Sequence, residues 1–226
     1  TMMIDKAFGK SGSRIVLEEY LEGPEVTVLA FCDGKRAVPM VSSRDHKRVF
    51  DNNKGPNTGG MGAVSPAPAY TPEIAEIVER DIIQRTIDAM ASEGAPFQGV
   101  LYTGLMITKN GPKVLEYNCR FGDPEAQVVI PRLKTDLVEV MQAVIDGDLT
   151  NAKIEWKSEV AVCVVIASGG YPGHYETGKI ISGLDDAEKN GSIVFHAGTA
   201  EKDGKIITVG GRVLGVTALG KDVDEA

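Results

Sequence analysis

Several features that mark well-known classes of protein are scarce in this chain of 226 residues. It has three cysteines, without CxxC spacing, and three scattered histidines, so neither a disulfide framework nor a zinc site is predicted. No apolar run is long enough to cross a bilayer. The formal net charge of −8 disfavours a polyanionic partner. We therefore expect a reduced, cytoplasmic protein with no nucleic-acid and no membrane partner.

Common catalytic signatures are also missing. There is no Walker A loop, no strand–GxGxxG–helix opening and no GxSxG elbow, which argues against P-loop, dinucleotide-binding and α/β-hydrolase proteins. The hydrophobic content of 42% is enough for one large domain or two small ones. If the chain acts on phosphate or acyl groups, it does so with residues outside these three motifs.

The most informative stretch is 114–125, a strand-like run that leads into a loop. Alternate side chains of a strand share a face, so Glu116, Asn118 and Arg120 are expected together and Leu115 on the opposite face. A carboxylate and an amide oxygen suit Mg²⁺, and a guanidinium suits phosphate or carboxylate. This row predicts metal-assisted phosphoryl chemistry.

The rest of the chain predicts antiparallel strands mixed with helices, an α+β class. Strands are expected over 14–20, 25–31, 36–41, 99–108, 114–120, 160–167, 193–196, 206–209 and 212–219. Helices are expected over 71–94, 135–145 and 184–189, with another helical region beginning near 123 or 124. Near 152 the sequence pattern changes to an apolar run followed by short strand-like segments separated by glycines. We therefore expect a domain over 1–152 and a small β-rich domain over 153–226.

A polar segment over 42–62 lacks any periodicity. It contains Asp-His-Lys-Arg at 45–48 and Gly-Pro-Asn-Thr-Gly-Gly-Met-Gly at 55–62. A loop of this length inside a compact domain is usually functional or disordered. Its small residues would let backbone amides approach a phosphate or carboxylate closely.

Three segments together resemble the ATP-grasp ligases. They are a hinge of the form Glu-x-x-Leu within 17–25, the glycine-rich loop, and the Glu-x-Asn-x-Arg strand. The motifs at 45–48, 55–62 and 116–125 resemble the glycinamide ribonucleotide synthetase family more closely still, and those at 169–173 and 210–214 resemble its C-terminal domain. The resemblance implies an ATP-grasp fold, antiparallel sheets with helices, followed by a small β-rich domain.

The resemblance also implies a reaction and its participants. ATP would phosphorylate glycine, the amine of 5-phosphoribosylamine would attack the acyl phosphate, and Mg²⁺ or Mn²⁺ would assist, within purine biosynthesis. A monomer is expected. The family pattern assigns the metal to Glu116 and Asn118, and the nucleotide to Glu18, Leu21, Glu25 and Leu115. It assigns catalysis to Arg120, Asp123 and Lys47, and substrate contacts to Asp45, Arg48, Asn57 and Gly60.

Alternatives remain for the function of the chain and for the roles of single residues. The chain could be another ATP-grasp carboxylate–amine ligase, a biotin carboxylase-like enzyme, or a non-catalytic ATP-binding fragment. Glu18 and the pair Lys47-Arg48 could be ordinary solvated charges, and Glu116 with Asn118 the exposed face of an edge strand. The family pattern also has phosphate-binding lysines before Thr1 and a segment after the last strand. From this pattern we expect the 226-residue chain to be inactive alone.

Overall fold

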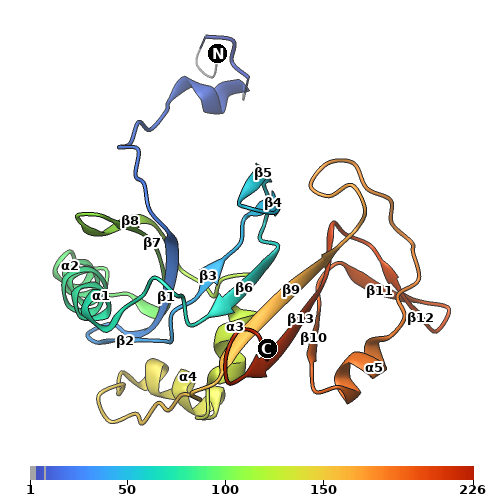
Figure 1. Ribbon diagram of the computed structural model, residues 1–226. Helices are drawn as coiled ribbons and strands as arrows, with labels where there is room; N and C mark the ends of the chain where they lie inside the picture. The colour runs from blue at the N-terminus through green and yellow to red at the C-terminus, as the bar shows by residue number, and fades with distance from the viewer. Residues whose placement is uncertain (1–3, 8) are drawn as a thin grey trace.

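Two antiparallel sheets form the framework of the protein (Figure 1). The structure is a computed structural model that describes residues 4–7 and 9–226. The first sheet has the order β2 (Ala37–Pro39), β1 (Glu25–Asp33), β7 (Gln98–Thr108), β8 (Gly111–Asn118). The second has the order β10 (Ile193–His196), β13 (Arg212–Gly220), β9 (Val160–Ala167), β6 (Gly62–Ser65), β3 (Arg44–Asp45).

Two small hairpins and several helices complete the fold. The hairpins are β4 (Arg48–Phe50) with β5 (Lys54–Asn57), and β11 (Thr199–Lys202) with β12 (Lys205–Thr208). One long helix consists of α1 (Pro72–Ile77), the π-helical η2 (Val78–Gln84) and α2 (Arg85–Ser92). The others are η1 (Gly9–Ser13), α3 (Ala126–Val129), η3 (Ile130–Arg132), α4 (Leu137–Asp146) and α5 (Leu184–Lys189).

The long helix begins where the sequence predicts and covers one face of the first sheet. Thr71 accepts a hydrogen bond from the Ile74 amide at 3.4 Å, and proline occupies the first helical position. The helix buries Val78, Ile83 and Ile87 against this face. Such burial of branched apolar side chains contributes the main stabilisation of the contact.

Strand β1 is buried on both faces because its side chains alternate between two cores. Val26, Val28 and Ala30 pack toward the long helix, while Leu29 and Phe31 pack into a second core with α3 and α4. A strand buried on both sides reads as a continuous apolar run, as the sequence of this segment does. β1 is therefore, with β7, one of the two central strands of the first sheet.

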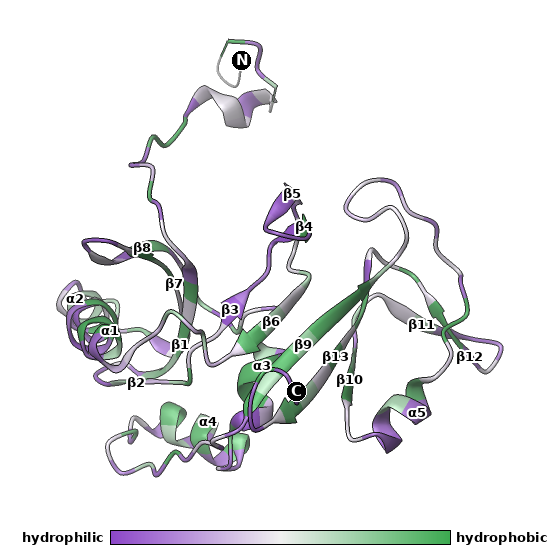
Figure 2. Ribbon diagram, in the orientation of Figure 1, coloured by the Kyte–Doolittle hydropathy of each residue, from purple (hydrophilic) through white to green (hydrophobic). Residues whose placement is uncertain are grey.

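The second sheet joins early and late parts of the chain. β9 pairs with β6 on one side and with β13 on the other, and Thr27 of β1 exchanges two backbone hydrogen bonds with Ser43 beside β3. Figure 2 shows that β9 and β13 are mostly apolar, whereas the β4–β5 hairpin is polar. The domain boundary expected near 152 stays a prediction, and the hydrogen-bonded sheet runs across it.

Two sequence expectations differ from the structure. Residues 14–20 form no strand, because no described segment pairs with their backbone. The side chains of Val16, Leu17 and Tyr20 are exposed. The segment 42–62 is not structureless, since it contains the short strands β3 to β6. The other expected strands and the helices expected over 71–94, 135–145 and 184–189 are present within a few residues of their predicted limits. Among the described residues, no helix is both long and apolar enough to span a bilayer.

The two-sided burial of β1 gives a stability prediction. Phe31→Ala should lower the free energy of unfolding by about 3–5 kcal/mol, since this side chain is 1% exposed and would leave a cavity. Phe50→Ala is the matched control, because Phe50 is 66% exposed on the β4–β5 hairpin. Urea denaturation of both variants provides the measurement, and equal losses would contradict the assignment of Phe31 to the core.

Candidate functional site

Two adjoining cavities lie between the first sheet and the segment 45–59, and one of them also borders the loop that precedes α3. Their volumes are about 170 and 140 Å³. Both are lined by Asp45, Lys47, Tyr102 and Glu116. The first is also lined by Glu25, Val26, Thr27, Gly104, Leu105 and Leu115. The second is also lined by Thr58, Gly59, Asn118, Arg120, Asp123 and Glu125.

A β-bulge in β8 corrects one sequence expectation. Glu116 pairs with Gly104 and Val114 with Leu105, so Leu115 is an extra residue opposite no partner. Strict alternation therefore fails at this point, and Leu115 and Glu116 line the same cavity. The expectation that Leu115 lies on the face opposite to Glu116 is wrong. An apolar side chain and a carboxylate thus share one wall.

The Glu116–Asn118 pair fits a magnesium ion that is completed by water and phosphate. Both residues line the smaller cavity. Within residues 4–7 and 9–226, no group of three or more His, Cys, Asp or Glu side chains could hold a metal. Mg²⁺ commonly takes only one or two carboxylates and keeps several waters beside substrate phosphates. A site with one carboxylate and one amide oxygen therefore suits Mg²⁺. It has too few protein ligands for a zinc or calcium site that is closed by side chains alone.

Two further carboxyl groups line the smaller cavity, the buried Glu125 and the half-buried Asp45. Glu125 is 2% exposed and accepts hydrogen bonds from the hydroxyls of Tyr102 at 2.8 Å and Thr27 at 3.2 Å. The Oδ1 atom of Asp45 is buried without a hydrogen-bond partner in the described part of the chain. Burial, and then the nearby charge of Glu125, raise the pKa of Asp45 to about 7. A buried acceptor without a donor is an unfavourable arrangement that a bound cation or donor would relieve.

Lys47 supplies the positive charge on this side of the cavity. Its Nζ atom lies 2.9 Å from the Glu25 carboxylate. Burial alone would lower the pKa of Lys47, but the hydrogen bond and charge of Glu25, with the charges of Asp45 and Glu116, raise it above its usual value. The amine therefore remains protonated at neutral pH.

The structure places other predicted site residues at the edge of the same cavities. Arg120 lines the smaller one and donates to the Phe121 carbonyl at 2.9 Å. Asp123 lines it too and is paired with Arg212. Gly60 is buried with φ +108, and a Cβ there would lie 2.7 Å from Asp45 Oδ1. Glycine is thus required at 60 by both conformation and space.

Four predicted residues are not brought to these cavities. Leu21 lines a separate cavity of about 570 Å³ beside the β7–β8 turn, and Glu18 is exposed on the segment that precedes it. Arg48 donates to the Gly55 carbonyl at 2.6 Å, and Asn57 is exposed on β5. Their assigned roles stay predictions.

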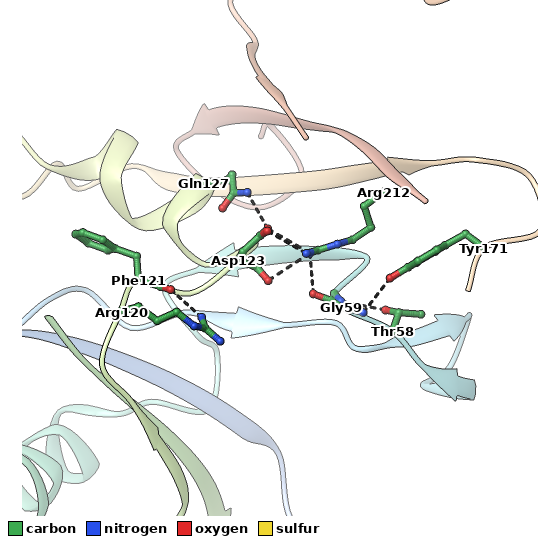
Figure 3. A network of polar contacts seen from close by, with 9 residues as sticks. Thr58, Gly59, Arg120, Phe121, Asp123, Gln127, Tyr171 and Arg212 are labelled. Carbon is green, nitrogen blue, oxygen red and sulfur yellow. Dashed lines mark hydrogen bonds and ion pairs between the residues drawn. The ribbon is translucent and has the colours of Figure 1, made fainter. Parts of the chain in front are cut away.

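The sequence analysis missed several residues around the cavity. They are Thr27, Tyr102, Glu125, Tyr171 and Arg212. Glu125 and Arg212 lie inside motifs noted in the sequence, at 116–125 and 210–214, but nothing local distinguished them. Figure 3 shows Arg212 and Tyr171 reaching from the C-terminal part of the chain to Gly59 and Asp123.

Comparison with known protein families agrees with this fold. A family model described as phosphoribosylglycinamide synthetase, ATP-grasp (A) domain, matches residues 1–126. The C-domain model of the same synthetase matches residues 161–226. The fold and site therefore define an ATP-grasp protein. Because the first model alone covers more than half of the chain, the chain belongs to the phosphoribosylglycinamide synthetase family.

Individual relatives agree with this assignment. A phosphoribosylamine–glycine ligase of Vibrio vulnificus is 52% identical over the whole chain, which covers 53% of that protein. A trifunctional purine biosynthetic protein of Gallus gallus is 55% identical over 98% of the chain, which covers 22% of that protein. The crystal structure of a Thermotoga maritima phosphoribosylamine–glycine ligase matches with a TM-score of 0.77 and 37% identity, over 92% of this chain and 51% of that one. The chain thus spans about half the length of the single-function relatives it matches.

More distant structures share the fold alone. The biotin carboxylase domain of a thermophilic 2-oxoglutarate carboxylase matches with a TM-score of 0.60 and 17% identity, over 96% of this chain and 46% of that one. An L-amino acid ligase of Bacillus licheniformis gives a TM-score of 0.60 and 17% identity, over 91% and 50%.

The half-buried Asp45 gives a pH prediction. Its pKa in the folded protein, about 7, lies above the ordinary value of 3.8, so the folded state retains a proton that the unfolded state loses. Stability is therefore lost as the pH rises from about 4 to 7, and the whole penalty is present above 7. Asp45→Asn removes this penalty.

Thermal melts without added divalent cations measure the effect. Asp45→Asn should raise the Tm relative to the parent protein more at pH 8 than at pH 5. The exposed Asp51→Asn is the control and should show no such difference. An Asp45→Asn effect that is the same at both pH values would refute the prediction.

Proposed function

We propose that the protein containing this chain joins glycine to 5-phosphoribosylamine, with ATP cleaved to ADP and phosphate. The observation that carries the proposal is the convergence of Glu116, Asn118, Arg120, Asp45 and Lys47 on adjoining cavities in a chain of this family. Such a ligation needs oxygen ligands for a metal ion, cations that hold phosphate, and a carboxylate that attracts the amino group of glycine. Glu116 with Asn118, Lys47 with Arg120, and Asp45 are of these three kinds.

The nucleotide side of the reaction would use the wall formed by β1 and β8. Glu116 and Asn118 would hold Mg²⁺, which when bound neutralises charge on the phosphates. Glu25 would accept hydrogen bonds from ribose hydroxyls. The bulge supports a nucleotide-facing role for Leu115, because it brings this apolar side chain to the cavity beside Glu116. Glu18 and Leu21 would meet adenine through backbone groups, as the family pattern implies.

The acyl side would use the opposite wall. An oxygen of the glycine carboxylate attacks the terminal phosphorus of ATP, and ADP leaves. Arg120 and Lys47 would hold the resulting acyl phosphate by charge-assisted hydrogen bonds. The partnerless Oδ1 of Asp45, with the Glu125 charge behind it, would attract the glycine ammonium group. Arg48, Asn57, Gly60 and Asp123 complete the proposed substrate contacts.

In the second step, the amine nitrogen of phosphoribosylamine attacks the glycyl carbonyl carbon. The carbon–nitrogen bond forms, the bond from carbon to the phosphate oxygen breaks, and the amine releases one proton. Pre-oriented cations at Lys47 and Arg120 would stabilise negative charge that develops on the departing phosphate. Holding both reactants beside each other in one site would also reduce the entropic part of the barrier.

Reduced cysteines support a cytoplasmic location. Cys32 and Cys163 are buried and Cys119 is exposed, and all three are free thiols. Burial, chiefly, raises the pKa of the Cys32 thiol to about 12 and also raises that of Cys163. Buried protonated thiols are structural rather than reactive. The expected monomeric state stays a prediction.

Other ATP-grasp chemistries would be separated by substrate. The complete gene product should form glycinamide ribonucleotide from glycine, phosphoribosylamine, ATP and Mg²⁺, and should show no ATP cleavage that depends on bicarbonate and biotin. Turnover only with the latter pair would favour a biotin carboxylase-like enzyme. Magnesium-dependent ATP binding without any turnover would favour a non-catalytic module. Product is followed by mass spectrometry.

Glu116 provides a specific test of the proposed metal site. In the complete gene product, Glu116→Ala should lower ligation by more than about a hundredfold, because the protein's one carboxylate ligand is lost. Calorimetry should show weaker Mg²⁺-dependent ATP binding in the same variant. Glu139→Ala, exposed on α4, is the control. Unchanged activity of Glu116→Ala at saturating Mg²⁺ would overturn the metal assignment.

A further inference from the structure

The C-terminal part of the chain reaches into the site through one guanidinium group. Arg212 begins β13, and its side chain is 23% exposed. Its Nη2 atom lies 2.9 Å from Asp123 Oδ2, and its Nη1 atom donates to Asp123 Oδ1 at 3.2 Å and to the Gly59 carbonyl at 2.7 Å (Figure 3). Arg212 therefore joins two segments that both line the smaller cavity.

The same turn is held by a second group from the C-terminal part. The Gly59 amide donates to the Tyr171 hydroxyl at 3.0 Å, so both backbone polar groups of Gly59 are bound by residues more than 110 positions away. A Cβ at Gly59 would lie 3.1 Å from the Arg212 guanidinium carbon. Glycine at 59 thus lets the guanidinium lie directly against the backbone.

From Gly59 the contacts continue to the cavity. Thr58 donates through both its amide and its hydroxyl to the Lys47 carbonyl, at 2.7 and 2.8 Å. The Gly60 amide in turn donates to the Thr58 hydroxyl at 3.0 Å. The position of the turn therefore determines where the Lys47 backbone and Gly60 lie relative to Asp45.

Arg212 also balances charge at this wall. Asp123, Asp45 and Glu125 all line the smaller cavity, and the charge of Arg212 favours ionisation of Asp45 as well as pairing with Asp123. Loss of the guanidinium would leave four carboxyl groups, those of Asp45, Glu116, Asp123 and Glu125, around a cavity whose lining cations are Lys47 and Arg120. Bidentate arginine–carboxylate pairs combine this charge with a fixed geometry that lysine cannot reproduce.

We propose that Arg212, assisted by Tyr171, is a positioning residue of the site, which fixes the 58–60 turn and Asp123 where the carboxylate and amine substrates meet. The C-terminal part of the chain would then belong to the substrate half of the site and not only to the scaffold. This inference rests on the proposed function for its kinetic consequences. Its structural consequence, ordering of the turn, does not depend on which substrates are used.

Kinetics of the complete gene product test the inference. Arg212→Ala should lower kcat/KM for glycine and phosphoribosylamine about tenfold to a hundredfold, while the KM for ATP changes less than about twofold. Arg212→Lys should restore part of the loss, because it keeps the charge but cannot bridge both partners. Tyr171→Phe should have a smaller effect in the same direction. Arg80→Ala, from an exposed ion pair on the long helix, is the control.

Hydrogen exchange of the 56–62 segment is the second measurement. Faster exchange there in Arg212→Ala, with a Tm close to that of the control, supports positioning. If Arg212→Ala does not fold, Arg212→Lys and Tyr171→Phe carry the test.

Unchanged kinetics and exchange in an active enzyme would overturn the inference, as would equal losses for ATP and the other substrates. An inactive parent protein would instead refute the proposed function, and the exchange measurement would still decide the role of Arg212.

Discussion

The site depends on one buried carboxylate, that of Glu125. Burying a charge is costly unless hydrogen bonds compensate for it, and here the compensation comes from Thr27 on β1 and Tyr102 on β7. The carboxylate therefore ties the loop before α3 to the two central strands of the first sheet. The same charge acts on Asp45 and, after burial, is the largest cause of the raised pKa of that carboxyl group. Glu125 thus both holds the fold together at this point and contributes to the electrostatics of the site.

The cations near Glu125 offset part of the negative charge on this side of the site. Lys47 lies inside the cavity wall and Arg212 at its margin, each paired with a carboxylate of its own. Both cations still act on Asp45, since each lowers a pKa that burial and Glu125 raise. In a protein with an overall charge of −8, Lys47 and Arg120 are thus the cations that line the two cavities, where phosphate chemistry would require them. Such local fields are strongest where water is excluded.

Local patterns predicted much of the fold because they act over a few residues. The Thr71-Pro72 cap acts within one helix and the Asn110-Gly111 turn within one hairpin, and both form as expected. Residues such as Arg212 could not be chosen this way, because its partner Gly59 lies 153 positions away. Leu115 was placed on the wrong face, since a bulge depends on how the neighbouring strand pairs. Residues 14–20 have strand-like composition, but composition cannot supply a pairing partner.

The bulge in β8 has a consequence for length variation within the family. The strand holds one residue more than its neighbour between the pairs Val114–Leu105 and Glu116–Gly104. A chain one residue shorter at 115 could keep both pairs and every side chain beyond them on its present face. It would lose only the apolar contribution to the cavity wall. At this point, an insertion or deletion would therefore alter the lining of the site without shifting the register of the sheet.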